Sequence, residues 1–142
     1  MKNYYVDSCI YLNLWKKEVD DSGALLWKYA EEFFEKVENE NSIIYYSGYL
    51  LKELLFTSDE NKFIEKLELF NYSSNYQRID LTKEEFEYAK KLKDANFELS
   101  FFDIIHALLA SKTNSILITR DKGLLEFAKT IHVIAKKPEE CL

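Results

Sequence analysis

Glycine, proline and cysteine are scarce in this chain, which has three, one and two of them among its 142 residues. So few glycines give no phosphate-binding or dinucleotide-binding loop, and no GxSxG nucleophile turn is present. The two cysteines, Cys9 and Cys141, lack a CxxC spacing, which argues against a cysteine metal site and favours a reducing, cytosolic setting. Because no Pro-rich or Ser/Gly-rich linker occurs either, we expect a single domain over residues 1–142.

A basic surface and a membrane-spanning run are also missing. The formal net charge is −6, so any contact with a nucleic acid must be local, because the surface as a whole repels phosphate. No stretch approaches the roughly 18 apolar residues of a membrane span, and Asp7 interrupts the N-terminal segment before a signal-like run develops. We therefore expect a soluble, cytoplasmic protein with no membrane contact.

The chain does contain enough apolar residues for a substantial core, at 47% hydrophobic and 31% charged. Short aromatic and β-branched runs predict strands at residues 4–6, 42–46, 76–79, 116–119 and 132–135, the third being the most weakly patterned. Helical patterns lie between them, at residues 24–38 after Ser22, 49–56 after Ser47, 59–70 from Asp59, 82–95 from a Thr82/Glu85 capping box, 100–110 from a weaker Ser100/Asp103 box, and 123–129. This alternation predicts an α/β class with a parallel sheet between helices.

Acidic residues recur where ligands gather in such sheets, at the carboxyl ends of the strands. Asp7 directly follows the first predicted strand, and Asp121 follows the fourth with one residue between. Glu53 lies about two turns into the helix after the second strand, and Asp103 lies in the first turn of its helix. Taken singly, the aspartates could be helix caps or partners of a helix dipole, and Glu53 a solvated residue.

Taken together, the four acids have a different implication. Like charges brought to one place repel, and each raises the pKa of the others unless a cation binds between them. Clusters of carboxylate oxygens suit Mg²⁺ or Mn²⁺. The pattern therefore favours a divalent metal site over four unrelated caps.

A family resemblance is carried by four segments in a fixed order: YYVDSCIYLNL, YYSGYLLKELL, SFFDIIHALLASKTNSILITRDKGLLEF and VIAKKPEECL. Together they resemble the ordered motifs of PIN domains, the fold of many small prokaryotic toxin ribonucleases of the VapC type, over nearly the whole chain. The acidic positions of that family fall on Asp7, Glu53, Asp103 and Asp121. The resemblance implies a three-layer PIN-like fold with a parallel four- to five-stranded sheet flanked by helices.

The resemblance also implies an activity and its partners. It predicts a ribonuclease that hydrolyses RNA phosphodiester bonds, with the four acids holding one or two Mg²⁺ or Mn²⁺ ions directly or through water. Ser8 and Thr119 match hydroxyl residues beside the family's acids and would orient carboxylates or water, although both could equally cap helices. A homodimer that is neutralised by a small antitoxin protein is implied as well.

Three cations adjoin the acids in sequence: Lys52, Arg120 and Lys122. They could form a local positive rim for the RNA substrate, or they could be ordinary surface charges. Arg120 stands where PIN domains often have a small polar residue. It could bind a phosphate or pair with a neighbouring acid, and simple surface exposure is the favoured expectation.

Neither histidine is predicted to act in the site. We expect His106 to be packed or half-exposed, His132 to begin the last strand at the opposite edge of the sheet, and Cys9 to serve packing. Two alternatives to a toxin remain open at this point: an RNA-processing PIN nuclease, and an inactive PIN-like module for protein interaction. Four intact acids argue against the inactive module.

Overall fold

A parallel β-sheet forms the middle layer of the molecule. The computed structural model describes residues 2–142, apart from the side chain of Tyr72, and within them five strands lie in the order β3-β2-β1-β4-β5. The strands are β1 (Asn3–Val6), β2 (Ile43–Tyr46), β3 (Tyr76–Arg78), β4 (Ile116–Ile118) and β5 (Ala135–Lys136). All neighbouring pairs are parallel, which confirms the predicted α/β class and the weakly patterned third strand.

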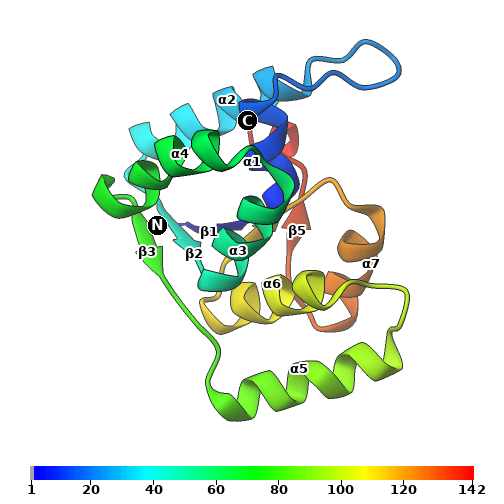
Figure 1. Ribbon diagram of the computed structural model, residues 1–142. Coiled ribbons are helices and arrows are strands. Elements are labelled where there is room, and N and C mark those ends of the chain that lie inside the picture. Colours follow the sequence, from blue (N-terminus) through cyan, green and yellow to red (C-terminus); the bar gives the residue numbers. More distant parts are fainter. Residues whose placement is uncertain (1) are drawn as a thin grey trace.

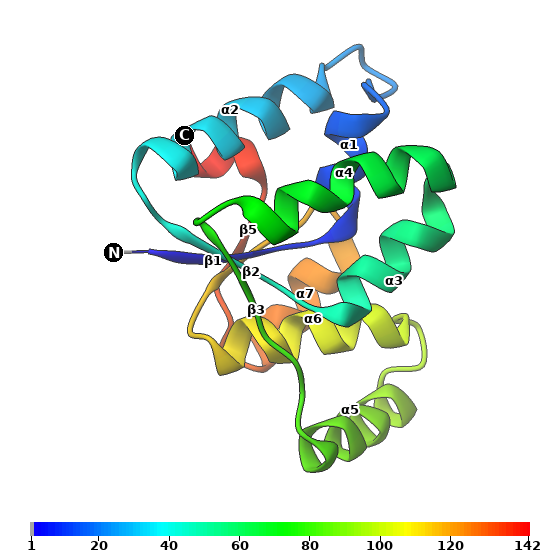
Figure 2. The same ribbon diagram turned by 60° about the vertical axis from the view of Figure 1, so that its left-hand side comes forward.

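Helices cover both faces of the sheet. One face carries α1 (Ser8–Trp15), α2 (Leu26–Asn39) and α4 (Glu60–Tyr72), and the other carries α6 (Phe101–Lys112) and α7 (Lys122–Thr130), with α5 (Lys83–Ala95) packed outside α6 (Figure 1). The remaining helix, α3 (Gly48–Thr57), continues from the end of β2, and a short 3₁₀ helix (Pro138–Cys141) packs against α2 (Figure 2). No helix within residues 2–142 has the length and apolar character needed to cross a bilayer.

The central strand is buried on both sides, because successive side chains of a strand point to opposite faces. Tyr4 and Val6 belong to the core under α1, α2 and α4, whereas Tyr5 belongs to the core under α6 and α7. All three side chains are at most 1% exposed. This position fixes the end of β1 in the middle of the molecule, where it is shielded by both helical layers.

Side-chain caps start most of the helices where the sequence predicted them. The predicted caps of α3, α4, α5, α6 and α7 each accept a backbone N–H of the first turn: Ser47, Asp59, Thr82, Ser100 and Asp121. The box from Thr82 to Glu85 is complete in both directions. At α6 the contact is the Ser100 half of the box, with Oγ accepting from the Asp103 N–H at 3.1 Å.

Two predicted element starts are wrong by two residues or more. The second helix begins at Leu26 rather than at residue 24, because Asp20 Oδ1 accepts both the Ser22 hydroxyl at 2.7 Å and its N–H at 2.9 Å, so Ser22 folds into a turn instead of capping. The last strand begins at Ala135, and His132 has a left-handed φ of 59°. Its N–H closes the end of α7 on the Lys129 carbonyl at 3.3 Å, which removes it from the strand.

No helix was predicted for the residues of α1, although Asp7 was named as a possible cap. The residues SCIYLNLW are apolar on nearly every side, so they lack the polar face that makes a helix recognisable. The helix is instead buried in the layer above the sheet, with Ile10 and Tyr11 fully covered. Asp7 does cap it, accepting the Ser8 N–H at 2.8 Å.

Candidate metal centre

Polar residues meet at the carboxyl ends of the three central strands. β1 ends at Val6, and the N–H of the next residue, Asp7, donates to the Ile118 carbonyl at 2.9 Å, which ties it to the end of β4. Residues 119–121 continue from β4, and Ser47 leads from β2 into α3. Because the strands are parallel, α1, α3 and α7 all begin at this edge. The edge therefore brings together residues that are far apart in the sequence.

Asp7 lies at the centre of this edge and is 3% exposed. Its Oδ1 accepts the Ser8 N–H, and its Oδ2 accepts the Thr119 hydroxyl at 2.7 Å and the Cys9 thiol at 3.3 Å. The Thr119 oxygen also accepts the Asp121 N–H at 3.1 Å. Thr119 thus links one acid to the backbone of another, and Cys9 contacts the site rather than serving packing alone.

Glu53 reaches the same place from the middle of α3. Its Oε1 lies 2.9 Å from Nε2 of His106, and that nitrogen is 4.0 Å from Oδ1 of Asp7. Burial by itself would raise the pKa of Glu53, but the hydrogen bond and the charge of His106 outweigh it, and the pKa is lowered. The bond in turn offsets the burial of the ring, so the pKa of His106 is raised.

His106 lies beside these acids, although no role in the site was predicted for it. It is completely buried, and one ligand atom from each of Asp7, Glu53 and His106 lies within 4.8 Å of the others. The available signal was its position three residues after Asp103, on the same side of a helix that is apolar elsewhere. A histidine with no solvent contact needs polar partners, and only the fold could show which ones.

Asp103 approaches the other acids from the first turn of α6. Burial raises the pKa of its carboxyl group to about 7, and the charges of Asp7, Asp121 and Glu53 add to the effect, against a smaller opposing contribution from His106. Within residues 2–142, its carboxylate accepts no hydrogen bond from a protein donor. The carboxylate is therefore crowded by negative charge, which the charge of His106 offsets only in part.

Asp121 stands at the outer side of the cluster. It is exposed and caps α7 through Oδ1, which accepts the Leu124 N–H at 2.9 Å. Asp103 and Asp121 both line a hollow of about 640 Å³ whose walls come from the end of α5, the loop after it, and α7. Of the four predicted acids, Asp7 and Glu53 thus lie beside His106 and the other two line the hollow, and the first two and Asp121 are near enough to raise the pKa of Asp103.

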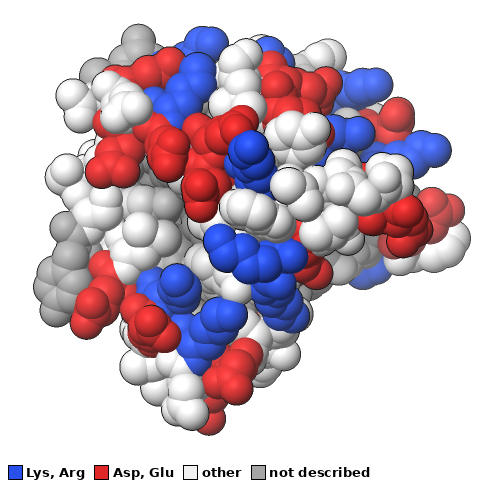
Figure 3. All heavy atoms as spheres, turned by 90° about the horizontal axis from the view of Figure 1, so that it is seen from above, with Lys and Arg blue, Asp and Glu red and all other residues white. Residues whose placement is uncertain are grey.

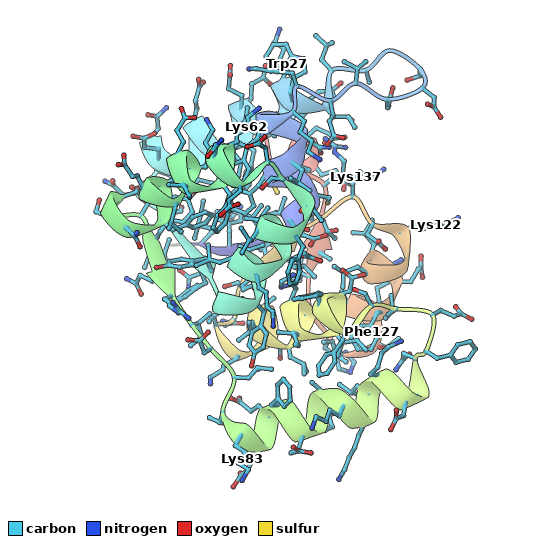
Figure 4. The ribbon with its side chains drawn as sticks, viewed as in Figure 1. Trp27, Lys62, Lys83, Lys122, Phe127 and Lys137 are labelled. Carbon is cyan, nitrogen blue, oxygen red and sulfur yellow. The ribbon has the colours of Figure 1, made fainter. Side chains whose placement is uncertain are left out.

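The predicted cations do not all lie at this site. Arg120 is turned away: its Nη1 and Nη2 bind Glu139 at 2.9 and 2.7 Å, and its Nε donates to Asn13 at 3.2 Å. Its side chain is 15% exposed, so the favoured expectation of simple surface exposure is wrong. The guanidinium group forms an ion pair with Glu139, which lies outside the site. Lys52 and Lys122 are exposed, and Lys122 points outward from the start of α7 (Figure 4).

Family comparison identifies the fold. The PIN domain model matches residues 4–130. The chain belongs to the PIN domain family. This confirms the resemblance seen in the four sequence segments, and PIN domains are in general nucleases that use divalent metal ions.

Solved structures share the PIN architecture at low identity. VapBC2 from Rickettsia felis, bound to a DNA fragment from their promoter, matches with a TM-score of 0.66 and 20% identity, covering 95% of this chain and 98% of that chain. VapBC-1 from nontypeable Haemophilus influenzae gives 0.62 and 18%, covering 96% and 98%. FitAcB from Neisseria gonorrhoeae gives 0.61 and 14%, covering 95% and 97%. A comparison with curated proteins finds no significant match.

The side chains of this PIN domain suit a hard divalent cation. A cation near the cluster would compensate the carboxylate of Asp103, which lacks a protein donor and is opposed by three other acids. Carboxylate oxygens are the ligands that Mg²⁺ and Mn²⁺ prefer. On the face formed by α2 and α4, acidic and basic side chains are interspersed (Figure 3).

Proposed function

We propose that this PIN domain is a Mg²⁺- or Mn²⁺-dependent endoribonuclease and the toxin of a VapBC-type pair. The observation that carries the proposal is the gathering of four acids, in which burial and then the charges of the other three raise the pKa of Asp103 to about 7. A structural role does not require this arrangement, because such a cluster destabilises the protein unless a cation compensates it. A cation site beside a hollow of about 640 Å³ suits a substrate that carries phosphate.

The proposed roles follow from the contacts of each side chain. Asp7, Glu53, Asp103 and Asp121 would hold the metal, directly or through water. When bound, the metal lowers the pKa of a coordinated water and neutralises charge on the scissile phosphate. Thr119 holds Asp7 through its hydroxyl group at 2.7 Å. Ser8 is buried beside Asp7 and donates its backbone N–H to that carboxylate.

Substrate binding would rest on few cations. Lys52 adjoins Glu53, and Lys122 lies on the wall of the hollow. Both are free of the ion pairs found within residues 2–142, whereas Arg120 is engaged with Glu139. RNA would therefore be held through the metal and these two lysines.

The partners and the location belong to the same proposal. The VapBC and FitAcB structures share the fold, and this supports a small antitoxin protein as the partner of the present chain. We further propose a homodimer in the cytoplasm. Light scattering of the purified protein tests the dimer, and co-purification with the product of an adjacent small gene tests the antitoxin.

Cleavage of RNA in Mg²⁺ or Mn²⁺ tests the activity. We expect the native protein to cut RNA, the Asp103→Asn variant to lose cutting, and binding of RNA to weaken in excess chelator. Asp94→Asn is the matched control, because it makes the same chemical change at an exposed position of α5. Activity that survives Asp103→Asn, or RNA binding that is unchanged by chelator, would contradict the metal-bridged site.

A further inference from the structure

A chain of hydrogen bonds runs from Ser47, which follows β2, through β1 and α6 to Glu53. The Ser47 hydroxyl lies 2.7 Å from the Tyr5 hydroxyl, which lies 2.8 Å from Nδ1 of His106. Nε2 of the same ring lies 2.9 Å from Oε1 of Glu53. Ser47, Tyr5 and His106 are completely buried, so no solvent competes for the contacts among these three side chains.

The partners of the ring decide where its protons lie. An ionised carboxylate accepts hydrogen bonds and donates none, so the contact between Glu53 and Nε2 requires a proton on Nε2. In the neutral ring, Tyr5 then donates its hydroxyl proton to Nδ1. In the charged ring, Nδ1 donates to Tyr5. Both forms leave Nε2 protonated, so the conclusion does not depend on the charge of His106.

The third form of the ring is disfavoured. A proton on Nδ1 alone would leave the lone pair of Nε2 facing a carboxylate oxygen at 2.9 Å, and two acceptors would then be in contact. Distance alone groups His106 with Asp7 and Glu53 as three ligand atoms within 4.8 Å. The hydrogen-bond pattern distinguishes His106 from the two acids, because a protonated ring nitrogen has no lone pair that could bind a metal.

We infer that His106 is a positioning residue that holds Glu53 through an Nε2–H donor, and that it is not itself a metal ligand. Tyr5 and Ser47 fix the plane of the ring, and the ring fixes one oxygen of Glu53. The consequence for the metal rests on the proposed function: the ligand set is made of oxygen atoms only, which favours Mg²⁺ or Mn²⁺ over Zn²⁺. The proton position itself does not rest on it.

Nitrogen NMR of the metal-free protein tests the proton position directly. The chain has two histidines, so a His132→Gln variant assigns the ring signals of His106. We expect Nε2 to be protonated and to remain so when Mg²⁺ is added to saturation. A ring protonated on Nδ1 alone, or loss of the Nε2 proton on Mg²⁺ binding, would overturn the inference. An inactive protein would refute the proposed function and leave this measurement standing.

Two further measurements separate positioning from ligation. Tyr5→Phe removes the hydroxyl that orients the ring, and we expect it to weaken Mn²⁺ binding about tenfold, as is usual for residues that orient metal ligands. Tyr4→Phe is the matched control, because Tyr4 is equally buried on the same strand but faces the other core. Pulsed EPR of bound Mn²⁺ should show no directly coordinated nitrogen. Equal affinities of the two variants, or a coordinated nitrogen, would refute the assignment.

Discussion

Replacing Asp103 by asparagine should stabilise the protein when metal is removed. The carboxylate is crowded by Asp7, Asp121 and Glu53 and has no protein donor within residues 2–142. Asparagine has nearly the same shape and no charge, and the helix cap is kept because Ser100 accepts the backbone N–H of residue 103. The substitution therefore removes the repulsion and leaves the local structure in place.

The size of the effect follows from the pKa of Asp103. It rises from 3.8 to about 7 in the folded protein. At ~1.4 kcal/mol per pKa unit, the ionised native state is destabilised by ~4 kcal/mol. Because the group is partly exposed, solvent screening reduces this penalty to ~2 kcal/mol. The unfolded chain ionises first, so the penalty is absent below the unfolded pKa, grows between the two pKa values, and is complete above the folded one.

Urea denaturation in chelator, at about pH 4 and about pH 8, measures this difference. We expect Asp103→Asn to raise the free energy of unfolding by ~2 kcal/mol at the higher pH and to change it little at the lower one. The exposed control Asp94→Asn should show no such pH dependence. When Mn²⁺ is added, the native protein should gain stability and the Asp103→Asn variant should gain less. Unchanged or lower stability of the variant at the higher pH would refute the account of charge crowding.

Two other substitutions test neighbouring contacts. Thr119→Val removes the hydroxyl that donates to Asp7 and should cost about 1–2 kcal/mol of stability and weaken Mn²⁺ binding, measured by denaturation and by metal titration. Arg120→Met breaks the two-bond pair with Glu139 and should cost roughly 2 kcal/mol while leaving Mn²⁺ affinity unchanged. Loss of metal affinity in the second variant would show that the arginine acts in the site after all.

Much of the fold was predictable because its signals are local. A cap such as Ser47 or Thr82 bonds to a backbone N–H three residues away, so sequence spacing alone locates the start of a helix. The sequence pattern mispredicted the start of α2, because the Ser22 hydroxyl donates to Asp20 instead of capping the helix. It missed α1, because that helix is buried on nearly all sides and has no polar face. The prediction that His132 begins the last strand was wrong because its left-handed conformation closes the preceding helix.

The acidic residues could be located from the sequence, as could the parallel strands that bring Asp7 and Asp121 to one edge of the sheet. The position of Asp7 or Asp121 after a strand is a property of a short segment, and the alternation of strands with helices along the chain indicates a parallel sheet. The hydrogen-bond partners of Arg120 and His106, in contrast, could be identified only in the folded protein. Arg120 turned to Glu139, and His106 joined Tyr5 to Glu53, through contacts 19, 101 and 53 residues apart. Such pairings depend on how the layers pack, which no local pattern encodes.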